Sequence, residues 1–268
     1  MQRWCTAGRD RDAARSYGQV VADAVFEHPR LASVYDALEP DRGDLRLYVD
    51  LLQEVDARSV LDVGCGTGTF AVLLAERGLE VTGVDPAAAS LAVARSKPGA
   101  DRVRWLCGDA TSLPPLQVDA ATMTANVAQA IVDPADWDAS LRAVRASLRP
   151  GGHLFFESRD PEDRAWEQWT RAATYGVQEV EGVGPVESWT EVVAVGEPLV
   201  TIRTTWVFRA DGAVLTSDST LRFRGQDELV AALLAHGYAV DAVRSAPDRF
   251  GRELVLLARR PGRADDRP

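Results

Sequence analysis

Three glycines at alternate positions, Gly64, Gly66 and Gly68, follow directly on the apolar run at residues 60–63. A helical pattern begins at Phe70. Glycines let the backbone turn sharply and let a ligand approach where a side chain would collide. The N-terminus of the helix that follows supplies free N–H groups. The segment therefore predicts a nucleotide-binding corner made of a strand, a glycine turn and a helix.

Three carboxylates accompany this corner. Asp62 lies inside the first strand, Asp85 ends the next apolar run, and Asp109 follows the third run within Gly108-Asp109-Ala110. Parallel strands end at one edge of a sheet, which is where open α/β sheets bind ligands. A carboxylate offers two acceptor oxygens and no donor, so it suits a pair of vicinal hydroxyls. We expect the three side chains to surround one ligand.

Short apolar strands alternate with helical patterns along much of the chain, which predicts a parallel sheet with helices on both faces. The expected helices are at residues 13–27, 41–55, 87–95, 137–148 and 226–236. The expected strands after the corner are at residues 81–84, 103–106, 120–124, 153–157, 239–243 and 253–258. No helix fits between the last two strands, so they should pair antiparallel.

The pattern changes after residue 157. A helix is expected at residues 161–174, a loop at 182–185, and strands at 187–195, 199–209 and 214–223. The middle strand alternates cleanly, since Val200, Ile202, Thr204, Trp206 and Phe208 would share one face. These residues predict an antiparallel insertion.

Composition excludes several classes of function. The formal net charge is −10 and no basic tract is present, which argues against a nucleic-acid partner. No apolar leader and no run long enough to cross a bilayer is present, so we expect a cytoplasmic protein with no membrane partner. No two of the three cysteines have metal-site spacing, and no metal is expected.

In this combination the chain resembles the class I S-adenosylmethionine-dependent methyltransferases. The resemblance rests on residues 61–68, Asp85, residues 108–110 and residues 148–152. It implies an α/β fold: a Rossmann-like, seven-stranded, mostly parallel sheet with an antiparallel C-terminal hairpin. The antiparallel β insertion would lie between the fifth strand and the last helix.

The same resemblance divides the chain into parts. Residues 1–30 are expected to be an N-terminal helical extension, and residues 31–160 with 225–260 the cofactor-binding core. Residues 161–224 are expected to be a helix and strand insertion, acting as a lid or a homodimer surface. Residues 261–268 are expected to be a disordered tail.

The resemblance also implies roles for single residues. The glycine loop would pack against the methionine part of S-adenosylmethionine, with Asp62 holding its amino group. Asp85 would accept hydrogen bonds from the ribose hydroxyls, and Asp109 one from the adenine amino group. The expected cofactor-binding residues are Tyr35, Asp62, Gly64, Cys65, Gly66, Gly68, Asp85, Pro86, Asp109, Ala110, Thr124 and Asn126. Simpler roles stay open, because such carboxylates often only cap a turn or a helix.

Methyl transfer is an in-line displacement at carbon, so positioning can supply most of the catalysis. A base is needed only where the acceptor must lose a proton. Glu157 and Arg159 leave the fifth strand at the ligand edge and are the candidates, unless they form a salt-bridged loop. Trp166 and Trp169 would share a helix face, covering the acceptor or packing in the core.

The sequence thus favours a methyltransferase that acts on a small molecule or a protein. A non-catalytic S-adenosylmethionine-binding regulator is the alternative from another class. An NAD-dependent oxidoreductase is disfavoured, because its fold uses the longer Gly-x-Gly-x-x-Gly spacing. The acceptor and the methylated atom are not specified by any motif.

Overall fold

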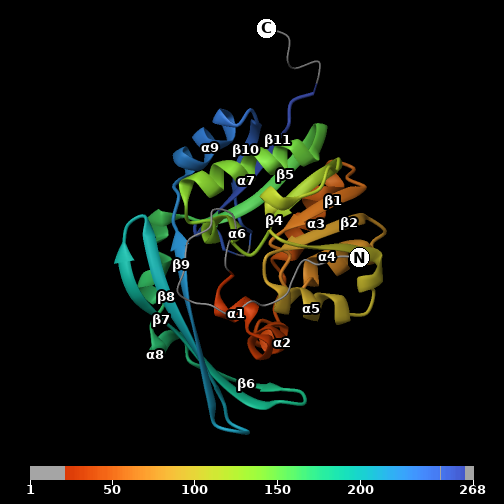
Figure 1. Cartoon of the computed structure of the whole chain (residues 1–268). Helices are drawn as coiled ribbons and strands as arrows, with labels where there is room; N and C mark the ends of the chain where they lie inside the picture. The colour runs from red at the N-terminus through yellow and green to blue at the C-terminus, as the bar shows by residue number, and fades with distance from the viewer. Residues whose placement is uncertain (1–21, 248, 263–268) are drawn as a thin grey trace, which may run out of the picture.

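The computed structural model describes residues 22–247 and 249–262, and a seven-stranded sheet forms the centre of the molecule (Figure 1). The strand order is β10-β11-β5-β4-β1-β2-β3. The five strands from β5 to β3 pair in parallel, while β11 runs antiparallel to both β5 and β10. The strands are β1 (Ser59–Val63), β2 (Glu80–Asp85), β3 (Val103–Cys107), β4 (Val118–Met123), β5 (Leu148–Arg159), β10 (Ala239–Ser245) and β11 (Glu253–Arg259). The predicted fold class is confirmed.

Helices cover both faces of this sheet. Neighbouring residues of a strand point to opposite faces, and accordingly Leu61 and Val60 belong to different apolar clusters. Leu141 of α7 packs with Leu61, whereas Leu52 of α3 and Leu74 of α4 pack with Val60. The helices of this part are α3 (Leu45–Glu54), α4 (Thr69–Glu76), α5 (Ala88–Ser96), α6 (Val127–Ala130), α7 (Pro134–Ser147) and α9 (Gln226–Ala235), with 3-10 turns η1 (Ala100–Arg102) and η2 (Ala110–Ser112).

A second sheet projects from one side of the core (Figure 1). Its order is β6-β7-β8-β9, and every pair is antiparallel. Its strands are β6 (Gly176–Val180), β7 (Gly184–Gly196), β8 (Leu199–Phe208) and β9 (Ala213–Arg222). The antiparallel insertion expected from the sequence is therefore present, with β6 as an additional strand.

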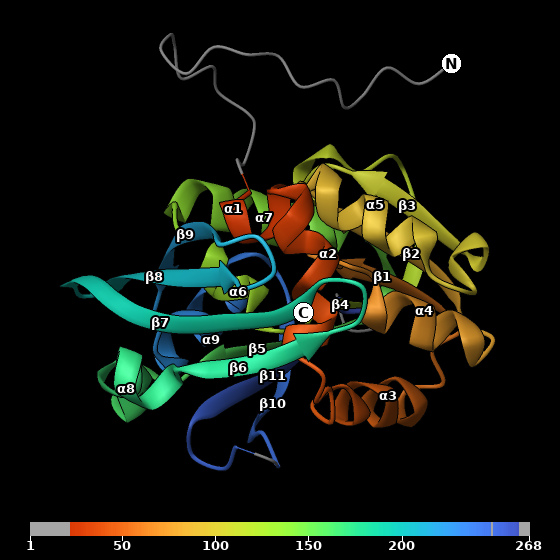
Figure 2. The same cartoon turned by 90° about the horizontal axis from the view of Figure 1, so that it is seen from below.

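The helices α1 (Ala24–Glu27) and α2 (Pro29–Leu38) lie between the second sheet and the core (Figure 2). Leu31 and Val34 of α2 are buried against Trp206 and Phe208 of β8. Both helices also contact α5 of the core. Of the predicted helix at 13–27, residues 13–21 lie outside the described residues, as do residues 263–268 of the expected tail at 261–268.

The helix predicted at residues 161–174 is wrong. The chain forms two 3-10 turns, η3 (Pro161–Asp163) and η4 (Ala165–Gln168), and the short helix α8 (Arg171–Thr174). Arg164 adopts a left-handed conformation with φ of 47°, which ends η3. The rings of Trp166 and Trp169 lie 4.5 Å and 6.2 Å from that of Phe223. Packing of both tryptophans against Phe223, the residue after β9, thus takes the place of helical regularity.

No helix among the described residues has the length and hydrophobicity needed to cross a membrane.

Candidate functional site

The glycine turn after β1 holds three residues with positive φ, at 71° for Gly64, 52° for Gly66 and 79° for Gly68. A Cβ on Gly64 would lie 2.4 Å from Val127 Cγ2, and one on Gly68 would lie 2.5 Å from the Trp105 ring. A Cβ on Gly66 would meet nothing within 4 Å. Packing therefore requires the outer two glycines, whereas the middle one leaves open space in front of the loop.

Asp85 ends β2 beside this loop. Its Oδ2 accepts the Gly66 N–H at 2.8 Å, and its Oδ1 accepts the Ala87 N–H at 2.8 Å. Burial raises the pKa of the Asp85 carboxyl, although the two N–H groups oppose that effect. The capping role that the sequence left open is thus present. Each oxygen keeps a lone pair, so the carboxylate can still accept hydroxyl groups from a ligand.

Asp62 lies beneath the loop and is 1 % exposed. The Thr122 hydroxyl donates to its Oδ1 at 3.1 Å, while its Oδ2 has no hydrogen-bond partner among the described residues. Burial, helped by the nearby charge of Asp85, raises the pKa of Asp62 to about 7. A buried carboxylate oxygen without a donor is costly. The position therefore suits a ligand that brings a cationic N–H group.

Asp109 follows β3 at the same edge of the sheet. Its Oδ1 accepts the Thr111 N–H at 2.8 Å and the Thr111 hydroxyl at 2.5 Å, which caps η2. Ala110 is buried next to it, at 2 % exposure. The third predicted carboxylate thus lies at the expected edge, with a local capping role of its own.

Two further predicted residues border the glycine loop. Cys65 is a buried free thiol, and burial raises its pKa well above the usual value. Pro86 is half-buried directly after Asp85. Neither side chain carries a charge that could bind a ligand. Both therefore contribute only to the surface against which a ligand at this edge of the sheet would pack.

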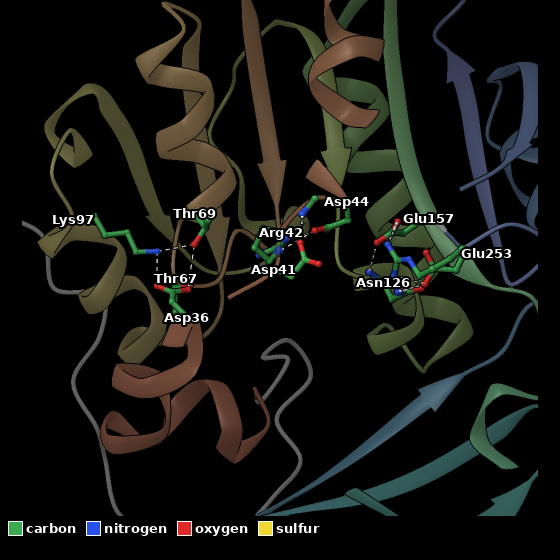
Figure 3. Close-up of polar contacts among 12 residues, drawn as sticks. Asp36, Asp41, Arg42, Asp44, Thr67, Thr69, Lys97, Asn126, Glu157 and Glu253 are labelled. Atoms are coloured by element: carbon green, nitrogen blue, oxygen red, sulfur yellow. Dashed lines mark hydrogen bonds and ion pairs between the residues drawn. The ribbon is translucent and has the colours of Figure 1, made fainter. Parts of the chain in front are cut away.

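The Tyr35-Asp36 pair lies on α2, and its aspartate ties this helix to the glycine loop (Figure 3). Asp36 Oδ1 accepts the Thr67 hydroxyl at 2.6 Å, and Asp36 Oδ2 lies 2.6 Å from Lys97 Nζ. Lys97 also donates to the Thr69 hydroxyl at 2.7 Å. The Tyr35 ring packs 5.7 Å from that of Phe26. The aspartate of the Tyr35-Asp36 element, which the resemblance places over the methionine end, thus holds the loop.

Arg42 was missed by sequence reasoning. Its Nε lies 3.1 Å from Asp44 Oδ1. Its positive charge partly opposes the rise in the pKa of Asp62 that burial causes. Figure 3 shows Arg42 and Asp44 between the Asp36 group and a second polar group around Glu157. A single arginine in a polar segment carries no sequence signal. Its place here is set by the path of the chain between α2 and α3.

The second polar group joins the end of β5 to the start of β11. Glu157 is 1 % exposed and Glu253 is 2 % exposed. The Asn126 N–H donates to Glu157 Oε1 at 3.3 Å, and Asn126 Nδ2 donates to Glu253 Oε1 at 3.1 Å. Arg249 lies 2.7 Å from Glu253 Oε1 and 3.7 Å from Glu157 Oε2. Burial, together with the charge of Glu253, raises the pKa of Glu157 to about 7.

Arg159 lies beside this group but turns toward α6 and η4. Its Nη1 donates to Gln129 Oε1 at 3.0 Å, and its guanidinium lies 5.3 Å from the Trp169 ring centre. Thr124 is buried at the end of β4, at 6 % exposure. The structure thus brings Glu157, Arg159, Thr124 and Asn126 to one edge, as predicted. Sequence reasoning missed Glu253, because no motif marks it.

Comparison with known proteins gives a domain match and distant relatives. Residues 60–152 match the family described as a methyltransferase domain. The chain is 34 % identical over 131 residues to a cypemycin N-terminal methyltransferase of Streptomyces sp, covering 48 % of this chain and 53 % of that protein. It is 34 % identical over 114 residues to a ubiquinone biosynthesis O-methyltransferase of Idiomarina loihiensis, covering 41 % and 45 %.

A solved structure extends the likeness to most of the fold. The amino pentose methyltransferase of Micromonospora echinaspora, solved with S-adenosylmethionine bound, superposes with a TM-score of 0.65. The two sequences are 26 % identical, and the likeness covers 85 % of this chain and 96 % of that one. By contrast, the chain spans about half the length of the two curated relatives it matches.

Proposed function

We propose that this protein transfers the methyl group of S-adenosylmethionine to a small molecule. The premise is its class I methyltransferase fold, with a match to the methyltransferase domain at residues 60–152. The observation that carries the proposal is the open space at Gly66, bordered by the carboxylates of Asp62 and Asp85. Glycine loops of this kind admit a nucleotide, and the unpartnered buried Asp62 oxygen asks for a cation.

The residues fit the parts of this methyl donor. Asp62 accepts the ammonium group at Oδ2, the oxygen without a partner in the described part of the chain. Arg42, whose charge acts on Asp62, holds the carboxylate of the same amino acid. Asp85 accepts the ribose hydroxyls at the lone pairs that Gly66 and Ala87 leave unused. Bound in this way, S-adenosylmethionine supplies an activated methyl group.

The remaining predicted residues complete the site. Asp109 and Ala110 receive the adenine ring at the end of β3, beside Pro86 and the loop residue Cys65. Tyr35 closes the methionine end from α2, where Asp36 fixes its helix to the loop. Thr124 and Asn126, at the end of β4, face the sulfonium. Each role is one that the side chain's position at this edge supports.

A small-molecule acceptor is supported by the names of the relatives. One acts in ubiquinone biosynthesis and one on an amino pentose, while the cypemycin enzyme leaves a peptide acceptor open. For the second sheet we propose a lid over the acceptor, with a homodimer surface as the alternative. Sedimentation of the whole protein separates these two. A cytoplasmic location without a nucleic-acid partner is proposed on the net charge of −10 and the absence of a basic tract.

The test is transfer of labelled methyl. The whole protein is incubated with methyl-labelled S-adenosylmethionine and a panel of amines, phenols and sugars, and labelled products are separated. A labelled product formed by the wild type and abolished by Asp85→Ala supports the proposal. Binding of S-adenosylhomocysteine with no labelled product from any acceptor, including an extract of the source cells, supports the non-catalytic regulator instead.

A further inference from the structure

We propose that the buried pair Glu157 and Glu253 binds an amino group of the acceptor and takes up its proton, so that the atom methylated is nitrogen. The inference rests on the proposed methyl transfer and adds the class of acceptor to it. Four observations carry it: the placement of the pair, the charges around it, the polar atoms that lack partners, and its link to the methyl-donor side.

The two carboxylates lie on the same face of neighbouring antiparallel strands. Val255 is the direct partner of Glu157 across the β5–β11 ladder, and Glu253 lies two residues before it. Residues two apart on a strand share a face, which makes the two glutamates diagonal neighbours. Both are at most 2 % exposed, at the edge of the sheet where Asp62 and Asp85 also lie.

The charges around the pair are mixed. Arg249 forms ion pairs with both carboxylates, whereas Arg159 turns away to Gln129. Asp44 adds a negative charge toward Glu157, and the Tyr48 hydroxyl faces it. Two close buried carboxylates hold a proton between them unless a cation compensates both equally. Arg249 lies 2.7 Å from Glu253 but 3.7 Å from Glu157, so Glu157 is the less compensated carboxyl and the one able to exchange a proton with a ligand.

Several buried polar atoms of this group have no hydrogen-bond partner in the described part of the chain. Two of them, Asn126 Oδ1 and Glu253 Oε2, can only accept. A single ligand group that satisfies both must bring at least two donors. An amino group brings two or three N–H donors, a hydroxyl brings one, and a quinone carbonyl brings none. The unpartnered atoms thus favour an amine over a single hydroxyl or a carbonyl.

Asn126 joins the pair to the methyl-donor side. It follows β4 in a left-handed conformation, with φ of 60°, and begins α6. Its N–H and its side-chain amide contact the two glutamates, while the next residue, Val127, packs against Gly64 of the glycine loop. One short segment therefore contacts both the loop and the carboxylate pair. Figure 3 shows Asn126 beside Glu157 and Glu253.

The proton and electron balance is simple. The acceptor ammonium gives one proton to the carboxylate pair, which frees the nitrogen lone pair. That lone pair forms the N–C bond as the C–S bond breaks, and the electrons of the broken bond remain on sulfur. The product is a methylammonium ion and neutral S-adenosylhomocysteine. The carboxyl then releases its proton to water, so that one proton appears for each methyl group transferred.

The first experiment identifies the methylated atom. The whole protein is incubated with ¹³C-methyl S-adenosylmethionine and matched acceptors: amino sugars with their hydroxyl counterparts, and peptides with free or acetylated N-termini. An N-methyl signal in the labelled product, from the amine of a pair and not from its partner, is the expected result. A product methylated on oxygen or carbon overturns the inference while leaving methyl transfer intact. Bound S-adenosylhomocysteine with no labelled product overturns both.

The second experiment tests the pair itself. With the amine identified by the first, Glu157→Gln and Glu253→Gln should each lower kcat/KM by about a hundredfold, a general-base effect. The rise of kcat with pH near 7 should disappear in Glu157→Gln. Glu80→Gln, at the exposed start of β2 on the opposite edge, is the control. Unchanged kcat/KM in both variants overturns the inference, and so does loss of S-adenosylhomocysteine binding in both, because it places the pair in the donor site.

Discussion

The backbone N–H of Gly66 donates to Oδ2 of Asp85 at 2.8 Å, so the middle of the glycine loop is held by the carboxylate that ends the neighbouring strand. The other oxygen of this carboxylate, Oδ1, accepts a hydrogen bond from the Ala87 N–H. The loop, the strand end and the turn into α5 therefore form one unit around the space at Gly66. A change at Asp85 acts on a ligand directly and through the loop.

Replacing Asp85 by asparagine is expected to lower the affinity for S-adenosylhomocysteine by at least about tenfold, or about 1.4 kcal/mol, because two charge-assisted acceptors are lost. Calorimetric titration of the purified variant measures this directly. Asp101→Asn, an exposed aspartate in η1, is the matched control and should bind like the wild type. Unaltered affinity in Asp85→Asn speaks against the ribose role.

Gly66→Ala should abolish binding of S-adenosylhomocysteine while leaving the protein folded. The added methyl meets no atom of residues 22–247 or 249–262 within 4 Å, so its cost on folding is the strain at φ of 52°, about 1 kcal/mol. The same methyl fills the space assigned to the ligand. Gly78→Ala provides the control, since it also has positive φ and open surroundings but lies in the turn after α4. Equal binding by both variants would contradict the placement.

Binding of S-adenosylhomocysteine should release a proton from Asp62. The pKa of this carboxyl is raised to about 7 in the folded protein, so the group is largely protonated at pH 6. A bound ammonium favours the charged form and lowers that pKa. Calorimetry in buffers of different ionisation enthalpy should give about one proton released at pH 6 and almost none above pH 8.

The same shift fixes the sign of the pH dependence of stability. A carboxyl whose folded pKa lies above its unfolded value binds more protons when folded, so its contribution to stability falls as the pH rises from about 4 to about 7. Asp62→Asn should flatten this fall in a urea denaturation series and abolish the proton release. If Asp62→Asn still releases about one proton when S-adenosylhomocysteine binds at pH 6, the proton comes from another group.

Removing the side chain of Asp36 should loosen the glycine loop. Asp36→Ala breaks the contacts to Thr67, Thr69 and Lys97, and we expect a loss of about 1–3 kcal/mol in unfolding free energy. Affinity for S-adenosylhomocysteine should fall less than in Asp85→Asn, because Asp36 acts through the loop. Asp41→Ala, which loses only a local bond to Gly43, is the comparison. Equal unfolding free energies of the two variants would contradict the role of Asp36 in holding the glycine loop.

The central sheet was predictable because its signals are local. Apolar runs, the glycine turn and the missing helix between the last two strands each show in a few consecutive residues. The segment at 161–174 was not, because its conformation is decided by Trp166 and Trp169 packing on Phe223, a residue about 50 positions away. The strand β6 has few apolar residues, and its pairing with β7 defines it.

The residues of the site also divide into those that the sequence predicted and those that it did not. Asp62, Asp85 and Asp109 were found because each lies in, ends or follows a predicted strand. Arg42 and Glu253 were missed, since only the folded chain brings them close to Asp62 and to Glu157. Sequence spacing reveals groups placed by one strand end. It does not reveal partners contributed by distant elements.

The central claim is that the glycine loop holds S-adenosylmethionine. Calorimetric titration of the whole protein with S-adenosylhomocysteine, and in parallel with NAD, tests it most directly. We expect saturable binding of one S-adenosylhomocysteine per chain and no heat from NAD. Saturable binding of NAD without binding of S-adenosylhomocysteine would contradict it.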